Sequence, residues 1–258
     1  MTTKNPVILL TGASSGIGAA LAIALASNWS ARIGLVARRE ELLEEVAASV
    51  RAAGGEALCL PYDVSDAEGI ASAVARCAEE FGPITHAIAN AGIGEVMFVH
   101  KSDAALIAKI MRVNYEGATN LFAAVLPQMI EGGSGHLVGV SSIAGFRGLP
   151  GSANYSASKA ALSAWLESAR IELKHRGISV SAVHPGFVST PMTDKNPFPM
   201  PFMVPVEKAA QIIVRGIAKK KRDINFPWPM VTMMRLVRLM PNWVYDRFAL
   251  LMSPFKKR

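Results

Sequence analysis

Cysteine is scarce in this sequence. Among 258 residues only Cys59 and Cys77 occur, and neither belongs to a CxxC motif or a histidine cluster. This argues against a disulfide framework and predicts no metal site, so a reducing compartment, the cytoplasm, is expected. Long apolar runs are also missing, and the segment MTTKNPVILLTG lacks the apolar core of a leader. Neither a spanning helix nor a signal peptide is therefore predicted.

Charged residues are few and unevenly placed. They make up 18% of the chain against 51% apolar residues, which is typical of a globular protein with a sizeable core. Residues 1–214 carry 16 basic and 18 acidic side chains, whereas residues 215–258 carry eleven basic and two acidic ones. The basic charge thus lies in the C-terminal tail and not on one face of a folded domain, as is usual in nucleic-acid-binding proteins. No nucleic-acid partner is therefore expected.

Short apolar runs alternate with helical patterns along most of the chain. Six strands are predicted near residues 6–12, 31–38, 56–64, 84–92, 135–142 and 178–186. Helical patterns are predicted between them, at residues 16–29, 39–54, 65–82, 103–130 and 154–176. Strands that alternate with helices of this length indicate βαβ units, and right-handed crossovers then give a doubly wound parallel sheet with helices on both faces.

The character of the sequence changes after the sixth strand. Five prolines between Pro191 and Pro205 exclude a long helix, and we interpret residues 189–206 as either a linker or a substrate loop. Its apolar residues favour an apolar or lipid-like substrate, although packing of a lid would use the same residues. They are Met192, Phe198, Met200, Phe202 and Met203. The predicted domains are a catalytic domain, 1–222, and an amphipathic C-terminal extension, 223–258.

The extension has two apolar helical pieces, about 229–240 and 242–252, which are separated by Pro241. Arg235, Arg238 and Arg247 interrupt the apolar pattern. Two interpretations remain open. Residues 224–258 could contact a membrane surface, with the cations meeting anionic headgroups. They could instead pack on the body of the protein or on a second subunit and cover the substrate cleft.

A glycine-rich turn follows the first predicted strand. In TGASSGIGAA, Gly12, Gly16 and Gly18 would allow a tight turn and close approach of a phosphate to a helix N-terminus. This turn, the NAG at Asn90–Gly92, the YxxxK at Tyr155–Lys159 with Ser142 upstream, and the PG at Pro185–Gly186 occur in order. Together they resemble the short-chain dehydrogenase/reductase family over residues 6 to about 190. The resemblance implies a Rossmann-type fold, a nicotinamide dinucleotide and a homodimer or homotetramer.

The second predicted strand ends in LVARRE, with Arg38 twenty residues after Gly18. A basic residue here favours the 2′-phosphate of NADP(H) over the free ribose hydroxyl of NAD(H). An acidic residue would repel the 2′-phosphate. The turn itself has Ser15 where many NADP-binding members carry a cation. With these arginines, the resemblance assigns cofactor contacts to Gly12, Ser14, Ser15, Gly16, Ile17, Gly18, Arg38, Arg39, Asp63, Val64, Asn90, Ala91, Gly92, Tyr155, Lys159, Pro185, Gly186, Val188 and Thr190.

The catalytic residues implied by the resemblance are Asn114, Ser142, Tyr155 and Lys159. Tyr155 and Lys159 share a helix face, so the ammonium, together with the positive nicotinamide in the oxidising direction, is predicted to lower the pKa of the phenol. Ser142 would hydrogen-bond the substrate oxygen, and Asn114 would hold a water beside Lys159. The predicted protein is an NADP(H)-dependent oxidoreductase acting on a ketone or secondary alcohol. The alternative is a catalytically idle dinucleotide sensor or scaffold that acts through its basic tail.

Overall fold

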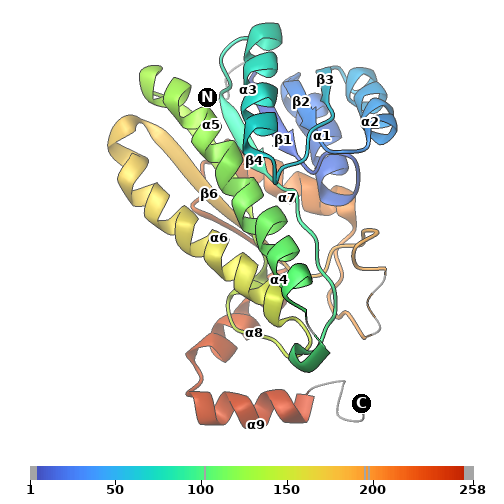
Figure 1. Ribbon diagram of the computed structural model, residues 1–258, viewed down its shortest axis with the longest axis vertical. Helices are drawn as coiled ribbons and strands as arrows, with labels where there is room; N and C mark the ends of the chain where they lie inside the picture. The colour runs from blue at the N-terminus through green and yellow to red at the C-terminus, as the bar shows by residue number, and fades with distance from the viewer. Residues whose placement is uncertain (1–4, 102, 195, 197, 253–258) are drawn as a thin grey trace.

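The computed structural model describes residues 5–101, 103–194, 196 and 198–252. Its centre is a seven-stranded parallel sheet in the order β3-β2-β1-β4-β5-β6-β7 (Figure 1). The strands are β1 (Val7–Thr11), β2 (Arg32–Val36), β3 (Glu56–Leu60), β4 (His86–Ala89), β5 (Gly135–Val140), β6 (Ile178–Pro185) and β7 (Asp223–Phe226). The central strands are almost wholly buried because helices cover both faces of the sheet.

Helices cover both faces of the sheet, and the last two in the chain lie at one end of the molecule (Figure 1). The helices are α1 (Gly16–Trp29), α2 (Glu40–Ala52), α3 (Ala67–Phe81), α4 (Ala104–Met111), α5 (Gly117–Glu131), α6 (Ala153–Glu172), α7 (Val206–Ala218), α8 (Trp228–Leu239) and α9 (Asn242–Met252), with short turns η1 (Val99–Lys101), η2 (Arg112–Glu116), η3 (Ile143–Gly145) and η4 (Leu173–Arg176). One apolar core joins the sheet to α1, α2 and α7. The other joins it to α3, α5 and α6, which lie together in front of the sheet in Figure 1.

The doubly wound Rossmann-type prediction is confirmed. All six predicted strands form, whereas β7 is an addition that the sequence pattern did not indicate. It has only four residues, two of them polar, and it follows a run of lysines. Because β7 begins at Asp223, the sheet continues past residue 222, where the sequence suggested that the catalytic domain ends. Between β6 and α7, no helix or strand occurs among the residues that the structure describes.

The sheet order reverses between β1 and β4, so the crevice beside their carboxyl ends is the expected place for a ligand. Two elements approach this end from elsewhere in the chain. The loop after β6 crosses above it, and α8 packs through Met230 and Met234 on Ile143, just after β5. The helical stretch predicted at 103–130 is continuous but contains the π-turn η2.

Besides the apolar packing of α8, Arg147 and a hydrogen bond from the Tyr245 hydroxyl to the Gly148 carbonyl join helices α8 and α9 to the body. The Arg147 guanidinium donates hydrogen bonds to the carbonyls of Arg238 and Met240 at 3.0 Å each, and to Asn242 Oδ1 at 2.9 Å. It also lies 4.4 Å from the centre of the Tyr245 ring. Since Arg147 follows Ser142 by five residues, the loop after β5 is joined directly to the corner between α8 and α9.

Candidate active site

The glycine turn between β1 and α1 is closed by the segment after β4. Gly12 and Gly16 have φ values of +66° and +55°, which glycine adopts without strain. The Asn90 side-chain amide donates to the carbonyls of Thr11 and Gly12 at 3.2 Å. At Gly18, an added Cβ would lie 2.1 Å from the Gly12 carbonyl oxygen. The first two glycines therefore shape the turn, and the third lets α1 pack against it.

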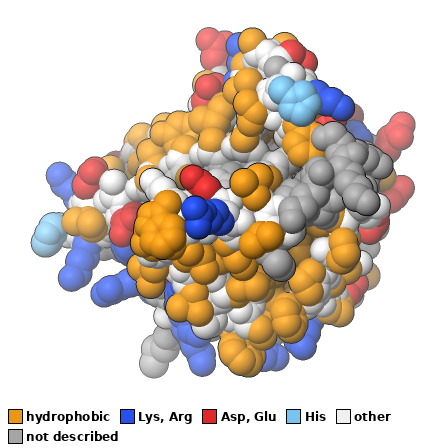
Figure 2. Space-filling view, turned by 90° about the horizontal axis from the view of Figure 1, so that it is seen from below, with side chains coloured by type: hydrophobic (Ala, Val, Ile, Leu, Met, Phe, Trp, Pro, Cys, Tyr) orange, Lys and Arg blue, Asp and Glu red, His pale blue; other side chains and the backbone are white. Residues whose placement is uncertain are grey.

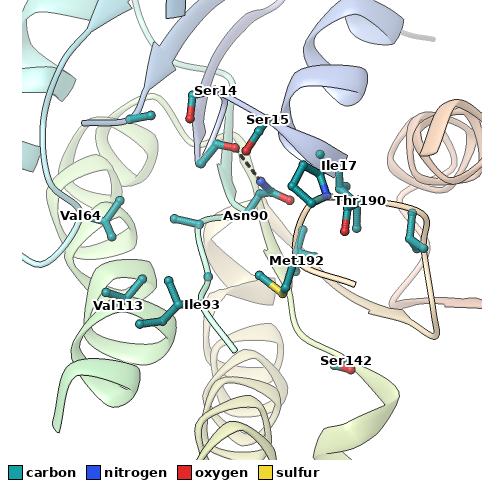
Figure 3. Close-up of a pocket in the computed structure, with 18 of the residues that line it drawn as sticks. Ser14, Ser15, Ile17, Val64, Asn90, Ile93, Val113, Ser142, Thr190 and Met192 are labelled. Atoms are coloured by element: carbon teal, nitrogen blue, oxygen red, sulfur yellow. Dashed lines mark hydrogen bonds between the residues drawn. The ribbon is translucent and has the colours of Figure 1, made fainter. Parts of the chain in front are cut away.

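A cleft of about 330 Å³ begins at this turn and continues past the ends of β4 and β5. Figure 3 shows Ser14 and Ser15 at one end, Ser142 at the other, and Asn90 and Ile93 between them. All the residues predicted to contact the cofactor line this cleft except Gly18, which is buried behind it: Gly12, Ser14, Ser15, Gly16, Ile17, Arg38, Arg39, Asp63, Val64, Asn90, Ala91, Gly92, Tyr155, Lys159, Pro185, Gly186, Val188 and Thr190.

The cleft fits an extended dinucleotide on structural grounds. A Cβ added at Gly12 would lie 2.7 Å from Ala91 Cα, so glycine lets the turn pack directly on the segment after β4, beside the N-terminus of α1 where a pyrophosphate would bind. Thr190 closes the turn from the other side, because a Cβ at Gly16 would lie 3.3 Å from its Cγ2 atom. The residues present therefore form a cradle for phosphate at the N-terminus of α1.

The end of β2 places two cations beside this cradle. The Arg39 guanidinium donates a hydrogen bond to Ser14 Oγ at 3.2 Å, which joins the second strand to the glycine turn. Arg38 lies 3.6 Å from the Asp63 carboxylate. Burial raises the pKa of Asp63, but hydrogen bonds from Ser65 and the charge of Arg38 outweigh it, and the pKa lies below its ordinary value. Asp63 is therefore ionised beside Arg38 at neutral pH.

Ser142 and Tyr155 meet at the far end of the cleft. Ser142 follows β5, and its hydroxyl oxygen accepts the N–H of Ala144 at 3.1 Å while it hydrogen-bonds Tyr155. Ser141 points the other way: its hydroxyl donates to the carbonyl of Lys159 at 2.8 Å, behind α6. Of the two neighbouring serines, only Ser142 presents its hydroxyl to Tyr155.

The phenol of Tyr155 is in its protonated form. Burial raises its pKa, the hydrogen bond with Ser142 lowers it, and burial dominates. This differs from the lowered pKa that the sequence led us to expect. The reason is that the Lys159 ammonium lies 5.8 Å from the centre of the Tyr155 ring and donates at 2.8 Å to the carbonyl of Val140.

Lys159 is a buried cation, with 3% of its surface exposed. Burial lowers its pKa to about 8. Its ammonium meets two other predicted residues, since a Cβ added at Gly92 would lie 3.3 Å from Lys159 Nζ and 3.4 Å from Asn114 Oδ1. The three residues therefore surround one small polar site behind Tyr155.

Asn114 does not line the cleft; it is fully buried in the π-turn η2. Its side-chain oxygen accepts the N–H of Ile93 at 2.7 Å, and its amide donates to the Ile93 carbonyl and to Ser158 Oγ at 2.9 Å. Asn114 thus fixes the segment after β4 against α6. π-turns are frequent at functional sites, and a continuous helical pattern in the sequence gives no sign of one.

A second cavity, of about 380 Å³ and mostly apolar, adjoins the first. Ser142 and Tyr155 line both cavities. Of the loop residues predicted for the substrate, Met192 and Phe198 line the second cavity, whereas Met200, Phe202 and Met203 do not. Helices α8 and α9 supply seven further lining residues, namely Met230, Met233, Met234, Val237, Tyr245, Phe248 and Ala249, and the rest come from the segments that follow β4, β5 and β6.

The extension therefore covers the cavity next to Tyr155, as the second interpretation of the tail predicts for residues up to 252. Residues 253–258, which also belong to the predicted membrane-contact segment, lie outside the described residues.

Two glycines that sequence reasoning did not single out also shape the site. Gly94 leaves room for the Tyr155 ring, and Gly145 lets η3 contact the backbone of Lys159.

Comparisons with known proteins agree with this geometry. The family model described as short chain dehydrogenase matches residues 6–198. An uncharacterized oxidoreductase of Myxococcus xanthus is 38% identical over 93% of this chain and 95% of its own length, and the ketoacyl reductase HetN of a Nostoc species is 35% identical over 86% and 79%. An alcohol dehydrogenase from the archaeon Thermococcus sibiricus, solved with 5-hydroxy-NADP, has a TM-score of 0.78 at 26% identity and covers 86% of this chain and 96% of its own.

Proposed function

This chain belongs to the short chain dehydrogenase family, and on that premise we propose that it is an NADP(H)-dependent oxidoreductase acting on an apolar, lipid-like ketone or secondary alcohol. One observation carries the proposal: Ser142 and Tyr155 form part of the wall between a dinucleotide-sized cleft and an apolar cavity. A carbonyl group held between them would lie beside both a cofactor in the cleft and a proton donor.

The proposed chemistry divides between cofactor and protein. The nicotinamide, when bound, supplies or accepts the hydride. In the reductive direction, the protonated Tyr155 phenol donates its proton to the substrate oxygen, and the raised pKa keeps that proton in place at neutral pH. The Ser142 hydroxyl donates a hydrogen bond to the same oxygen as negative charge develops. Lys159 and Asn114 complete the proposed group behind the phenol, where their polar atoms could hold a water.

The two arginines after β2 support the choice of NADP(H). A 2′-phosphate bound beside Ser14 would meet Arg39 directly and Arg38 next to it, because Arg39 already reaches the glycine turn. Guanidinium groups bind phosphate through charge-assisted hydrogen bonds, each worth about 1.5–3 kcal/mol. Ser15 supplies no charge, so the preference would rest on the arginines.

Arg38→Ala is expected to weaken NADP(H) binding about 10- to 100-fold, because one such bond is lost, and to change NAD(H) binding little. Titration of intrinsic fluorescence with both cofactors measures this. Arg215→Ala, which removes an exposed cation from α7, is the matched control and should change neither affinity. Equal loss of NADP(H) and NAD(H) affinity in the Arg38 variant would contradict the assignment.

The apolar cavity supports a hydrophobic substrate. We expect kcat/KM for NADPH-dependent reduction of methyl ketones to rise roughly 3- to 4-fold per added methylene, at about 0.8 kcal/mol each, until the cavity is filled. Absorbance of NADPH at fixed enzyme concentration across a chain-length series measures this, with ketone-free mixtures as the blank. A flat or falling series would contradict an apolar substrate.

Assembly and location complete the proposal. We propose a homodimer or homotetramer, supported by the exposed face of α6, where Ala157, Ala160 and Ala164 leave a flat surface that ends at Ile171. A cytoplasmic location is supported by Cys59 and Cys77, which are both free thiols. None of the described helices is long and apolar enough to span a bilayer.

A further inference from the structure

We propose that the outward faces of α8 and α9 bind an anionic phospholipid surface, and that apolar substrate passes from this surface into the adjoining cavity. The substrate half rests on the proposed function; the binding half rests on the surface alone. We call this surface the outer face and define it by the exposed residues Trp228, Arg235, Leu236, Leu239, Trp243, Arg247 and Leu250.

Helix α8 is apolar on two opposite sides. Its inner side, with Met230, Met234 and Val237, is buried and lines the cavity. Its outer side carries Trp228 and Leu239, which are 77% and 79% exposed, with Leu236 between them. A helix that only covered a cavity would need one apolar side, since the other would be in water. The outer side therefore indicates a second apolar environment.

Helix α9 has the same arrangement. Tyr245, Phe248 and Ala249 point toward the cavity, whereas Trp243 and Leu250 are each 68% exposed. Figure 1 places α9 at one end of the molecule, and the view from that end shows hydrophobic side chains over most of the surface, with Lys and Arg mainly along its margin (Figure 2). An exposed apolar area with a polar margin is typical of an interaction site.

The charges on these helices select the partner. Arg235, Arg238 and Arg247 are exposed beside the apolar residues, against the single carboxylate of Asp246. Arginines that flank tryptophan and leucine fit the boundary of an anionic bilayer, where indole rings lie at the headgroup level and cations meet phosphate. A second copy fits less well, because an isologous contact through this face would gather three arginines from each subunit with only one carboxylate each, Asp246, to pair with them.

The cavity opens toward this region of the surface. Met192 and Met233 line the cavity and are also about 40% exposed, so they mark its mouth. Met233 belongs to α8, three residues from Leu236 of the outer face. An apolar ketone dissolved in the lipid would therefore meet an apolar mouth beside the attached helices, and Arg147 keeps α8 and α9 docked on the catalytic loop.

The test is co-sedimentation of the full chain with vesicles of phosphatidylcholine alone or mixed with phosphatidylglycerol. We expect binding to the mixed vesicles that weakens as salt is raised, and at least a tenfold loss of binding in Leu239→Ser/Trp243→Ser. Ile23→Ser/Ile130→Ser, which replaces exposed isoleucines on α1 and α5, is the matched control and should bind as the parent does. Equal binding to both vesicle types, or none to either, would overturn the proposal.

Two further readouts separate the possible failures. Light scattering without vesicles reports whether the outer face joins subunits: if only Leu239→Ser/Trp243→Ser reduces the oligomer, the face is a subunit interface and the membrane proposal is wrong. Reduction of a short, water-soluble ketone by each variant reports folding and chemistry. Activity without vesicle binding would contradict only the proposal that the outer face binds a membrane. Vesicle binding without activity would count against the oxidoreductase function and would leave the membrane proposal supported.

Discussion

Tyr155→Phe is expected to lower kcat for ketone reduction about 10³-fold, within the range of general acid catalysis. The ring and its packing against Gly94 would stay, so only the hydroxyl and its hydrogen bond with Ser142 are lost. Because the phenol is the only proposed proton donor to the substrate oxygen, no other group would replace it. NADP(H) affinity should change less than threefold, since the cradle at the glycine turn is untouched. Stopped assays under saturating NADPH and ketone measure the loss.

The control is Tyr115→Phe, which removes a hydroxyl from a ring that packs on the core beneath α5. Its kcat should stay within twofold of the parent. Unchanged turnover in Tyr155→Phe would remove the catalytic role. Unchanged cellular function in that variant, together with loss of function when the basic tail is neutralised, would instead favour the alternative of an idle dinucleotide sensor or scaffold.

The positions of the glycine turn and the Tyr–Lys pair could be predicted because each depends on local chain geometry. Gly12 and Gly16 adopt positive φ values, and only a residue without a Cβ does so freely. Tyr155 and Lys159 are four apart on α6, so helical periodicity alone puts them on one face. The doubly wound parallel sheet likewise follows from right-handed crossovers between apolar runs that are each long enough to form a buried strand, whereas the order of the strands was not predicted.

The direction of the Lys159 side chain could not be predicted, because it depends on contacts between distant segments. The Val140 carbonyl that accepts the hydrogen bond from Lys159 lies at the end of β5, 19 residues earlier. Asn114 and Gly92, which surround the ammonium, come from two further segments. In the cofactor-free protein burial raises the Tyr155 pKa, which the spacing of the two residues could not reveal; the predicted lowering also counted the positive nicotinamide and stays a prediction for the complex.

The placement of α8 and α9 depends in part on Arg147, which the sequence does not distinguish from any other surface arginine. Its partners are mostly backbone carbonyls at the end of α8, and such acceptors leave no pattern in side chains. The bounds of both helices were close to the prediction, since Pro241 separates them. Both helices have apolar residues on two opposite sides, so the sequence could not show which side faces the body.

Lys159→Met is expected to abolish turnover and yet to stabilise the cofactor-free protein at pH 7. A pKa lowered from 10.5 to about 8 means that folding buries an ammonium at an unfavourable free energy of about 3 kcal/mol at neutral pH. Methionine has nearly the same length and no charge. The stability that the variant gains would be reduced by about 1 kcal/mol, because the Val140 carbonyl loses its hydrogen bond. We therefore expect a net increase in the free energy of unfolding of about 2 kcal/mol at pH 7, measured by urea denaturation.

The pH dependence of this gain distinguishes it from a packing effect. Between about pH 8 and 10.5 the native protein has released the Lys159 proton while the unfolded chain still binds it, so the parent becomes more stable relative to the Met variant as pH rises. The difference between the two proteins should therefore shrink toward pH 10, while titrations common to both cancel. Lys208→Met, at an exposed lysine of α7, should change stability little at either pH. A Met variant that is less stable than the parent at pH 7, or a gain that does not diminish with pH, would show that the buried ammonium is fully compensated.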